Sequence, residues 1–151
     1  MEIYNEDGTL QTGYWSHKYN HPGLSYEIAI SIFSDQIVWV NGPFRAGMSD
    51  LQIFKDKGLA ALLMLAKERA VADGTYNHFA VSQRGTGTHE WKHAKNRYRA
   101  RQESVNRRLK IFKCLQDRWR HDEGFHGDVV RAIAFLTQLS FGQNPLMESI
   151  V

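Results

Sequence analysis

The sequence has little cysteine and no long apolar run. Cys114 is the only cysteine among 151 residues, which excludes an internal disulfide and a cysteine-rich zinc site and fits a reducing compartment. No apolar stretch reaches the roughly 18 residues that a membrane-spanning helix needs, so we expect no membrane partner. The first residues show no basic region followed by an apolar stretch, and we expect no secretory signal.

The chain also lacks an internal repeat and a segment with the composition of a linker. Its hydrophobic content of 42% and its aromatic content of 12% are sufficient for a packed core. Its length is normal for one domain. The sequence therefore predicts a single domain over residues 1–151.

The net charge of +3 hides a strong asymmetry along the chain. Residues 92–120 hold 11 of the 19 lysines and arginines against two acids, Glu103 and Asp117, so this segment carries +9 and the rest carries −6. Such a block indicates a surface for a polyanion such as nucleic acid, although a solvated helix face is the alternative. The candidate nucleic-acid-binding residues are Lys95, Arg99, Arg107, Lys110 and Lys113.

Apolar patterns predict three strands, besides a short, weak strand before the turn at Asp7-Gly8. Residues 24–32 alternate and are rich in β-forming residues, and with residues 37–40 they predict an antiparallel hairpin. Residues 69–72 are short and apolar and run into a Gly-rich loop, which predicts another strand. We expect the hairpin and this strand to share one sheet.

Helical patterns follow the hairpin. Ser49-Asp50 is typical of a helix start, and residues 59–65 continue a helical pattern. The clearest helix is expected over residues 94–116, and a last helix is expected to start at Asp128. The long helix should face inward with Tyr98, Val105, Leu109, Phe112 and Trp119. This order of elements predicts an α/β fold in which helices pack on a sheet.

Three acids occupy positions that suit metal-dependent phosphodiester cleavage. Asp7 and Asp73 follow expected strand ends, and Glu103 lies on the long helix. Magnesium prefers oxygen ligands and keeps several waters, so few carboxylates suffice, and paired ions activate water and stabilise a leaving oxygen. Spacing alone leaves the alternative open that these acids merely lie near turns.

Four motifs carry a resemblance that spans nearly the whole chain. They are Asp7-Gly8-Thr9, the segment Ile37-Val38-Trp39-Val40-Asn41-Gly42-Pro43-Phe44, Ala72-Asp73-Gly74-Thr75-Tyr76, and the segment 99–110 around Glu103. The Trp39 to Pro43 run and the segment around Glu103 are the most specific. In this order they resemble the DDE nuclease domain of Harbinger-type transposases.

The resemblance implies a ribonuclease-H-like mixed sheet and a metal-binding catalytic triad of Asp7, Asp73 and Glu103. It implies a transposase-derived DNA endonuclease or strand-transfer domain that uses Mg²⁺ or Mn²⁺. DNA is the implied partner, and the nucleus is the implied location, with the cytoplasm otherwise.

Two departures from the family pattern lead to further expectations. The stretch between Thr9 and Trp15 is shorter than the family usually has, so the first strand is expected to be truncated. No helix-turn-helix segment precedes Asp7, so we expect no separate DNA-binding domain. A separate DNA-targeting protein or a homo-oligomer would then direct the nuclease to its target.

Two alternative functions stay open. The chain is either an active nuclease or an inactive DNA-binding or interaction protein derived from a transposase, in which Glu103 only pairs with Arg99 and Arg107. A minor alternative is a zinc metalloprotease, because His89, Glu90 and His93 form a His-Glu-x-x-His sequence. The extended zincin pattern would need a third ligand further along the chain.

Overall fold

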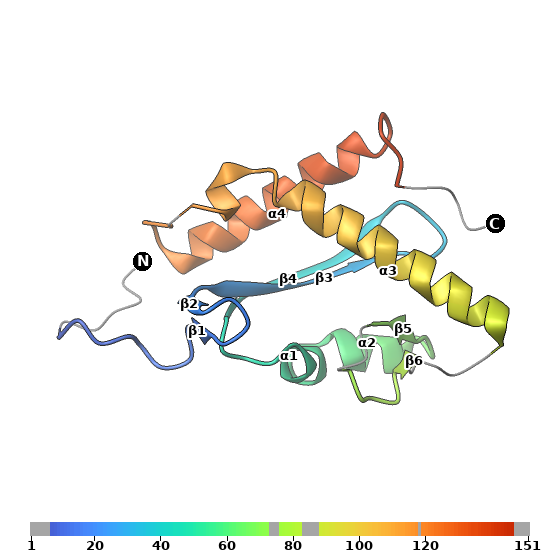
Figure 1. Cartoon of the computed structure of the whole chain (residues 1–151), viewed down its shortest axis with the longest axis horizontal. Helices are drawn as coiled ribbons and strands as arrows, with labels where there is room; N and C mark the ends of the chain where they lie inside the picture. Colours follow the sequence, from blue (N-terminus) through green and yellow to red (C-terminus); the bar gives the residue numbers. More distant parts are fainter. Residues whose placement is uncertain (1–6, 73–75, 83–87, 118, 147–151) are drawn as a thin grey trace.

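A computed structural model describes residues 7–72, 76–82, 88–117 and 119–146. Its strands are β1 (Trp15–Ser16), β2 (His21–Pro22), β3 (Leu24–Ile30), β4 (Ile37–Arg45), β5 (Ala70–Val71) and β6 (Val81–Ser82). Its helices are α1 (Asp50–Asp56), α2 (Leu59–Leu65), α3 (His89–Leu109) and α4 (Glu123–Ser140), with a 3-10 turn η1 (Lys113–Leu115) before α4. The β3–β4 hairpin separates two layers: α3 and α4 lie on one side, and α1, α2, β5 and β6 lie on the other (Figure 1).

The structure confirms the predicted hairpin. Strands β3 and β4 pair antiparallel, from Leu24 opposite Arg45 to Ile30 opposite Ile37. Side chains alternate between the two faces of a strand, and Ile28 and Ile30 pack against the core under α3 and α4. Both long helices therefore pack against one face of the hairpin.

Two hydrophobic clusters form the core, one in each layer. The larger one joins α3, α4 and the chain after α4, and the smaller one joins α1, α2 and the β5–β6 pair. Their buried members are Val105, Leu109, Ile133, Ala134, Phe141 and Leu146 in the first, and Phe54, Ala60, Ala80 and Val81 in the second.

The tip of the hairpin is fastened to both long helices by polar contacts. Gln138 of α4 accepts a hydrogen bond from the Ile37 amide at 2.6 Å and donates one to the Asp35 carbonyl at 2.6 Å. Arg101 of α3 forms an ion pair with the Asp35 carboxylate at 2.5 Å and donates to the carbonyl oxygens of Ile32 and Ser34. Arg101 and its neighbours therefore fix one face of α3 against the hairpin.

Helix α3 begins and ends earlier than residues 94–116. Its N-terminus is capped by Thr88, whose side chain accepts a hydrogen bond from the Trp91 amide at 3.3 Å. The helix ends at Leu109, so Phe112 and Trp119, which the sequence predicts on its inward face, lie beyond it. Phe112 packs against the same core from the turn after the helix. The apolar pattern in the sequence therefore extends beyond the last helical residue.

Helix α4 starts at Glu123 and not after Asp128. The Asp122 side chain accepts a hydrogen bond from the Phe125 amide at 3.0 Å and so caps the helix six residues before Asp128. Gly127 lies inside the helix, where it is buried and approaches Pro43. Close packing against the hairpin explains why a glycine is accommodated at this position.

The single mixed sheet predicted from the sequence is not formed by the described residues. Strands β1 and β2, β3 and β4, and β5 and β6 make three separate two-stranded sheets. The strand expected over residues 69–72 is confirmed as β5, but it pairs with β6 and not with the hairpin. Strands of two residues offer few ladder hydrogen bonds, so β5 cannot extend the hairpin sheet by itself. A strand over residues 1–6 lies outside the described residues.

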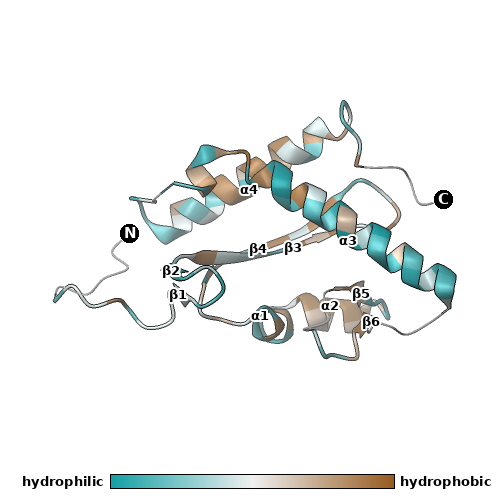
Figure 2. Cartoon of the chain, viewed as in Figure 1, coloured by the Kyte–Doolittle hydropathy of each residue, from teal (hydrophilic) through white to brown (hydrophobic). Residues whose placement is uncertain are grey.

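Hydrophobic residues of the hairpin and of α4 gather between the layers, whereas α3 is mostly hydrophilic, above all in its first turns (Figure 2). Within the described ranges, no helix combines the length and the apolar content that crossing a membrane requires.

Candidate nucleic-acid interface

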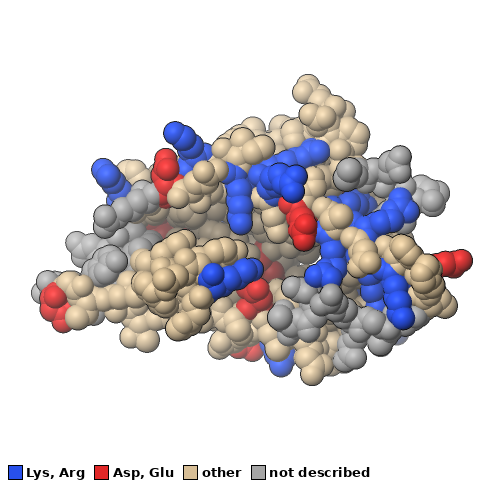
Figure 3. Space-filling model, viewed as in Figure 1, with Lys and Arg blue, Asp and Glu red and all other residues tan. Residues whose placement is uncertain are grey.

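One face of α3 carries a row of cations and the acid Glu103. At about 100° per residue, the six side chains of this row lie within about 40° of Glu103 around the helix axis. They are Lys92, Asn96, Arg99, Glu103, Arg107 and Lys110, and we call them the α3 stripe. Lys and Arg side chains outnumber acids on the face of the molecule over α3 (Figure 3).

The side chains opposite the α3 stripe are packed into the fold. Val105 is fully buried and Leu109 nearly so. Arg101 is 5% exposed and holds Asp35, and Arg108 donates to the carbonyl oxygens of Asn144 and Pro145. These two arginines contribute to the +9 of the basic segment, but their guanidinium groups fasten α3 to the rest of the molecule.

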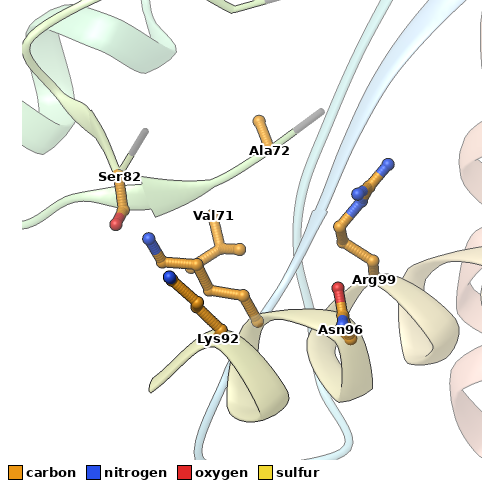
Figure 4. A pocket seen from close by; sticks show the side chains of 7 residues that line it. Val71, Ala72, Ser82, Lys92, Asn96 and Arg99 are labelled. Carbon is orange, nitrogen blue, oxygen red and sulfur yellow. The ribbon is translucent and has the colours of Figure 1, made fainter. Parts of the chain in front are cut away.

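The first half of the α3 stripe lines a pocket of about 240 Å³. Its other wall is formed by β5 and β6, which run parallel and contribute their last residues, Val71 and Ser82. Lys92 extends from α3 toward these strand ends, whereas Arg99 extends from α3 at the other side of the pocket, beyond Ala72 (Figure 4). The carboxyl ends of parallel strands are a common place for ligands, and the described lining contains three cations, an amide and a hydroxyl. The full lining is Val71, Ala72, Ser82, Lys92, Lys95, Asn96 and Arg99.

The five predicted nucleic-acid-binding residues have different surroundings. Lys95 is only 6% exposed, with its ammonium nitrogen 5.4 Å from the centre of the Trp91 ring, so it belongs to the pocket wall and not to the outer surface. Arg99 also lines the pocket, and Arg107 and Lys110 are exposed further along the stripe. Lys113 is exposed on η1, beyond the helix. Sequence reasoning missed Lys92 and Asn96, which helical spacing from Arg99 would have shown.

Of the three predicted acids, Glu103 lies on the face of α3 that carries the pocket. Glu103 is exposed one helical turn beyond Arg99, and in the described part of the chain it forms no ion pair with Arg99 or Arg107. Asp73 lies outside the described residues, but it directly follows Ala72, which lines the pocket. The carboxylate of Glu103 is therefore available on the face that carries the pocket.

Asp7 lies apart from α3. The segment that follows it is at the end of the molecule opposite to β5, β6 and the first turn of α3 (Figure 1). Its carboxylate accepts hydrogen bonds from the Thr9 hydroxyl at 2.5 Å and from the Thr9 amide at 2.9 Å. These bonds lower the pKa of Asp7. The structure does not bring Asp7 and Glu103 together, and the triad as a whole stays a prediction.

No group of three or more His, Cys, Asp or Glu residues suited to a metal ion occurs among the described residues. The structure brings two further acids together, Glu27 on β3 and Asp50 at the start of α1. Burial raises the pKa of Glu27, the hydrogen bond from the Trp39 indole at 2.7 Å opposes the rise, and the charge of Asp50 adds to it. This pair has no third acidic partner in the described part of the chain.

The His-Glu-x-x-His sequence lies on the first turns of α3, where the rings of His89 and His93 are 4.5 Å apart between centroids. Both histidines are exposed. A catalytic zinc ion needs three protein ligands, and the described ranges supply no third side chain beside this pair. The metalloprotease alternative therefore gains no support from the fold.

Comparison with known proteins gives one match. Residues 5–138 match the family model described as DDE superfamily endonuclease. Neither the curated proteins nor the solved structures contain a match. The matched region includes α3 with Glu103, the hairpin and the β5–β6 pair, and it covers most of the chain. The chain belongs to the DDE superfamily endonucleases.

Proposed function

We propose that this chain is a transposase-derived, metal-dependent DNA endonuclease domain, in which the α3 stripe holds the phosphodiester backbone. The observation that carries the proposal is the cationic pocket at the carboxyl ends of β5 and β6, with Glu103 one turn along the same helix face. Phosphate oxygens are the groups that Lys and Arg side chains most often contact in protein–DNA complexes. Such an activity requires access to DNA, so the proposal includes a nuclear location.

Asp73 and Glu103 are the residues that would hold Mg²⁺ or Mn²⁺. Glu103 fits because its carboxylate is exposed and, in the described ranges, makes no ion pair. Asp73 fits by its place in the sequence, immediately after the pocket residue Ala72. A bound divalent ion would activate water and stabilise the leaving oxygen. Lys92 and Arg99 would orient the scissile phosphate beside these acids and offset its negative charge.

Titration calorimetry with Mn²⁺ tests the metal site. The wild type should bind the ion, and Asp73→Ala and Glu103→Ala should each weaken binding, because a hard cation needs carboxylates from both elements. Asp56→Ala is the matched control, since Asp56 is exposed at the end of α1. Asp7→Ala should bind as the wild type does, because the Asp7 segment lies at the other end of the molecule.

The same titration separates the nuclease from an inactive DNA-binding protein. Equal binding by the wild type and by Asp73→Ala, or no binding by either, would remove the metal site. DNA binding that persists without a metal site would then favour the inactive alternative.

A further inference from the structure

A second group of cations lies at the far end of α3 from the pocket. Tyr19, in the turn between β1 and β2, is 55% exposed and stacks on His21 at 6.0 Å between ring centroids. The Lys18 ammonium nitrogen lies 5.3 Å from the centre of the Tyr19 ring, and that of Lys110 lies 5.9 Å from it. We call Lys18, Tyr19 and Lys110 the Tyr19 cluster.

The Tyr19 cluster brings like charges together from distant parts of the sequence. Lys18 comes from the β1–β2 turn and Lys110 from the end of α3, and both approach the same exposed ring. In the described part of the chain, neither lysine forms an ion pair with a carboxylate. The ring attracts both cations, so two positive charges share one exposed aromatic side chain. An anionic ligand that contacts both ammonium groups would offset these charges.

The length of α3 between the pocket and the Tyr19 cluster sets the length of duplex DNA that could contact both. From Lys92 to Lys110 the α3 stripe rises about 27 Å, at about 1.5 Å per residue. Duplex DNA rises about 3.4 Å per base pair, so this length corresponds to about eight base pairs. Along the helix axis, Glu103 lies about 16 Å from Lys92 and about 10 Å from Lys110.

We propose that the Tyr19 cluster is a second anchor for duplex DNA, so that the chain holds about eight base pairs between this cluster and the pocket. The inference rests on the proposed function only in taking DNA as the ligand, and it does not depend on catalysis. Contacts at both ends of α3 hold the phosphate backbone on either side of Glu103. A ligand that reaches from the pocket only as far as Glu103 occupies about five base pairs and leaves the Tyr19 cluster uncovered.

Fluorescence anisotropy tests this proposal with labelled DNA hairpins that have random stems of about five, eight and twelve base pairs. The whole chain is used in the presence of a chelator, so that cleavage cannot occur. Wild-type affinity should rise from the shortest stem to about eight base pairs and change little beyond it. The Lys18→Ala/Lys110→Ala variant should lose this rise, because the added base pairs then meet no cation.

The salt dependence gives a second measure on the eight-base-pair stem. Between about 50 and 200 mM salt, the wild type should lose about tenfold more affinity than the double variant, since two phosphate contacts are missing. Lys55→Ala/Lys57→Ala is the matched control, because both lysines are exposed on and after α1 and lie off the stripe. This control should behave as the wild type does.

Three outcomes would overturn the proposal. These are equal length dependence in the wild type and the Lys18→Ala/Lys110→Ala variant, equal losses in the control pair, and no binding by the wild type at low salt. Loss of metal binding or of cleavage leaves these measurements unchanged, so failure of the nuclease assignment is distinguishable from failure of the second anchor.

Discussion

At the scale of single residues, burial decides which cations are available for a ligand. A count of charges does not distinguish among the eleven basic residues of 92–120. In the structure, Arg101 and Arg108 make contacts within the fold. Their roles could not be predicted, because Asp35 and Asn144 are far from them in the sequence. Helical spacing places Glu103, Arg107 and Lys110 on one face of α3, and all three are exposed.

Arg101→Ala should lower the free energy of unfolding by about 2–3 kcal/mol. The substitution removes the ion pair and leaves the Asp35 carboxylate and the carbonyl oxygens of Ile32 and Ser34 without their donor. Urea unfolding followed by circular dichroism measures the effect. Arg97→Ala is the control, since Arg97 is exposed on the same helix. Equal stability of the two variants would show that the Asp35 clamp does not stabilise the fold.

Glu27→Gln should stabilise the protein at neutral pH. Burial raises the pKa of Glu27, so the folded chain holds this proton more tightly than the unfolded chain does. The contribution of Glu27 to stability is present below the unfolded pKa and is lost as the pH rises through the raised folded value. Glutamine keeps an acceptor for the Trp39 indole without the buried charge.

Thermal unfolding from acidic to neutral pH checks this prediction. The melting temperature of Glu27→Gln should exceed that of the wild type at neutral pH, and the difference should shrink as Glu27 becomes protonated. A difference independent of pH would mean that the carboxylate charge is not the cause.

At the scale of elements, local patterns predicted the hairpin, the start of α1, the strand β5 and the existence of α3 and α4. The bounds of the long helices depend on capping hydrogen bonds by Thr88 and Asp122, which hydrophobic periodicity does not contain. The pocket was not predictable, because it combines the ends of β5 and β6 with α3 across a sequence separation that one chain pattern cannot reveal.

Helix α3 should bind duplex DNA mainly through phosphates and with little sequence preference. Arg107→Ala/Lys110→Ala should weaken binding to all sequences alike and reduce the slope of log affinity against log salt by roughly two units. Anisotropy with a random duplex at several salt concentrations measures the slope. The single change Arg97→Ala, on another face of α3, should leave the slope unchanged. An affinity that does not depend on salt concentration would mean that the cations of the α3 stripe do not contact phosphates and only keep the protein soluble.

At the scale of the whole molecule, the hairpin lies between the two layers, and α3 crosses over it so that its first turns reach the β5–β6 pair (Figure 1). The pocket and the Tyr19 cluster lie at the two ends of this helix, with Glu103 between them. Separation of the hairpin from the β5–β6 pair could not be predicted, because local residue patterns do not encode which strands pair. Membership of the DDE superfamily endonucleases and the outward position of Glu103 lead to the same expectation of DNA cleavage.

Cleavage of a supercoiled plasmid in the presence of Mg²⁺ or Mn²⁺ tests whether this chain is a metal-dependent DNA endonuclease that uses Glu103. The wild type should convert supercoiled DNA to nicked or linear products, and a chelator should abolish this conversion. Glu103→Gln should lose activity by about a hundredfold or more while it still binds DNA, because it removes a metal ligand and leaves the cations in place. Equal activity of the wild type and Glu103→Gln, or no metal-dependent product from the wild type, would contradict the account.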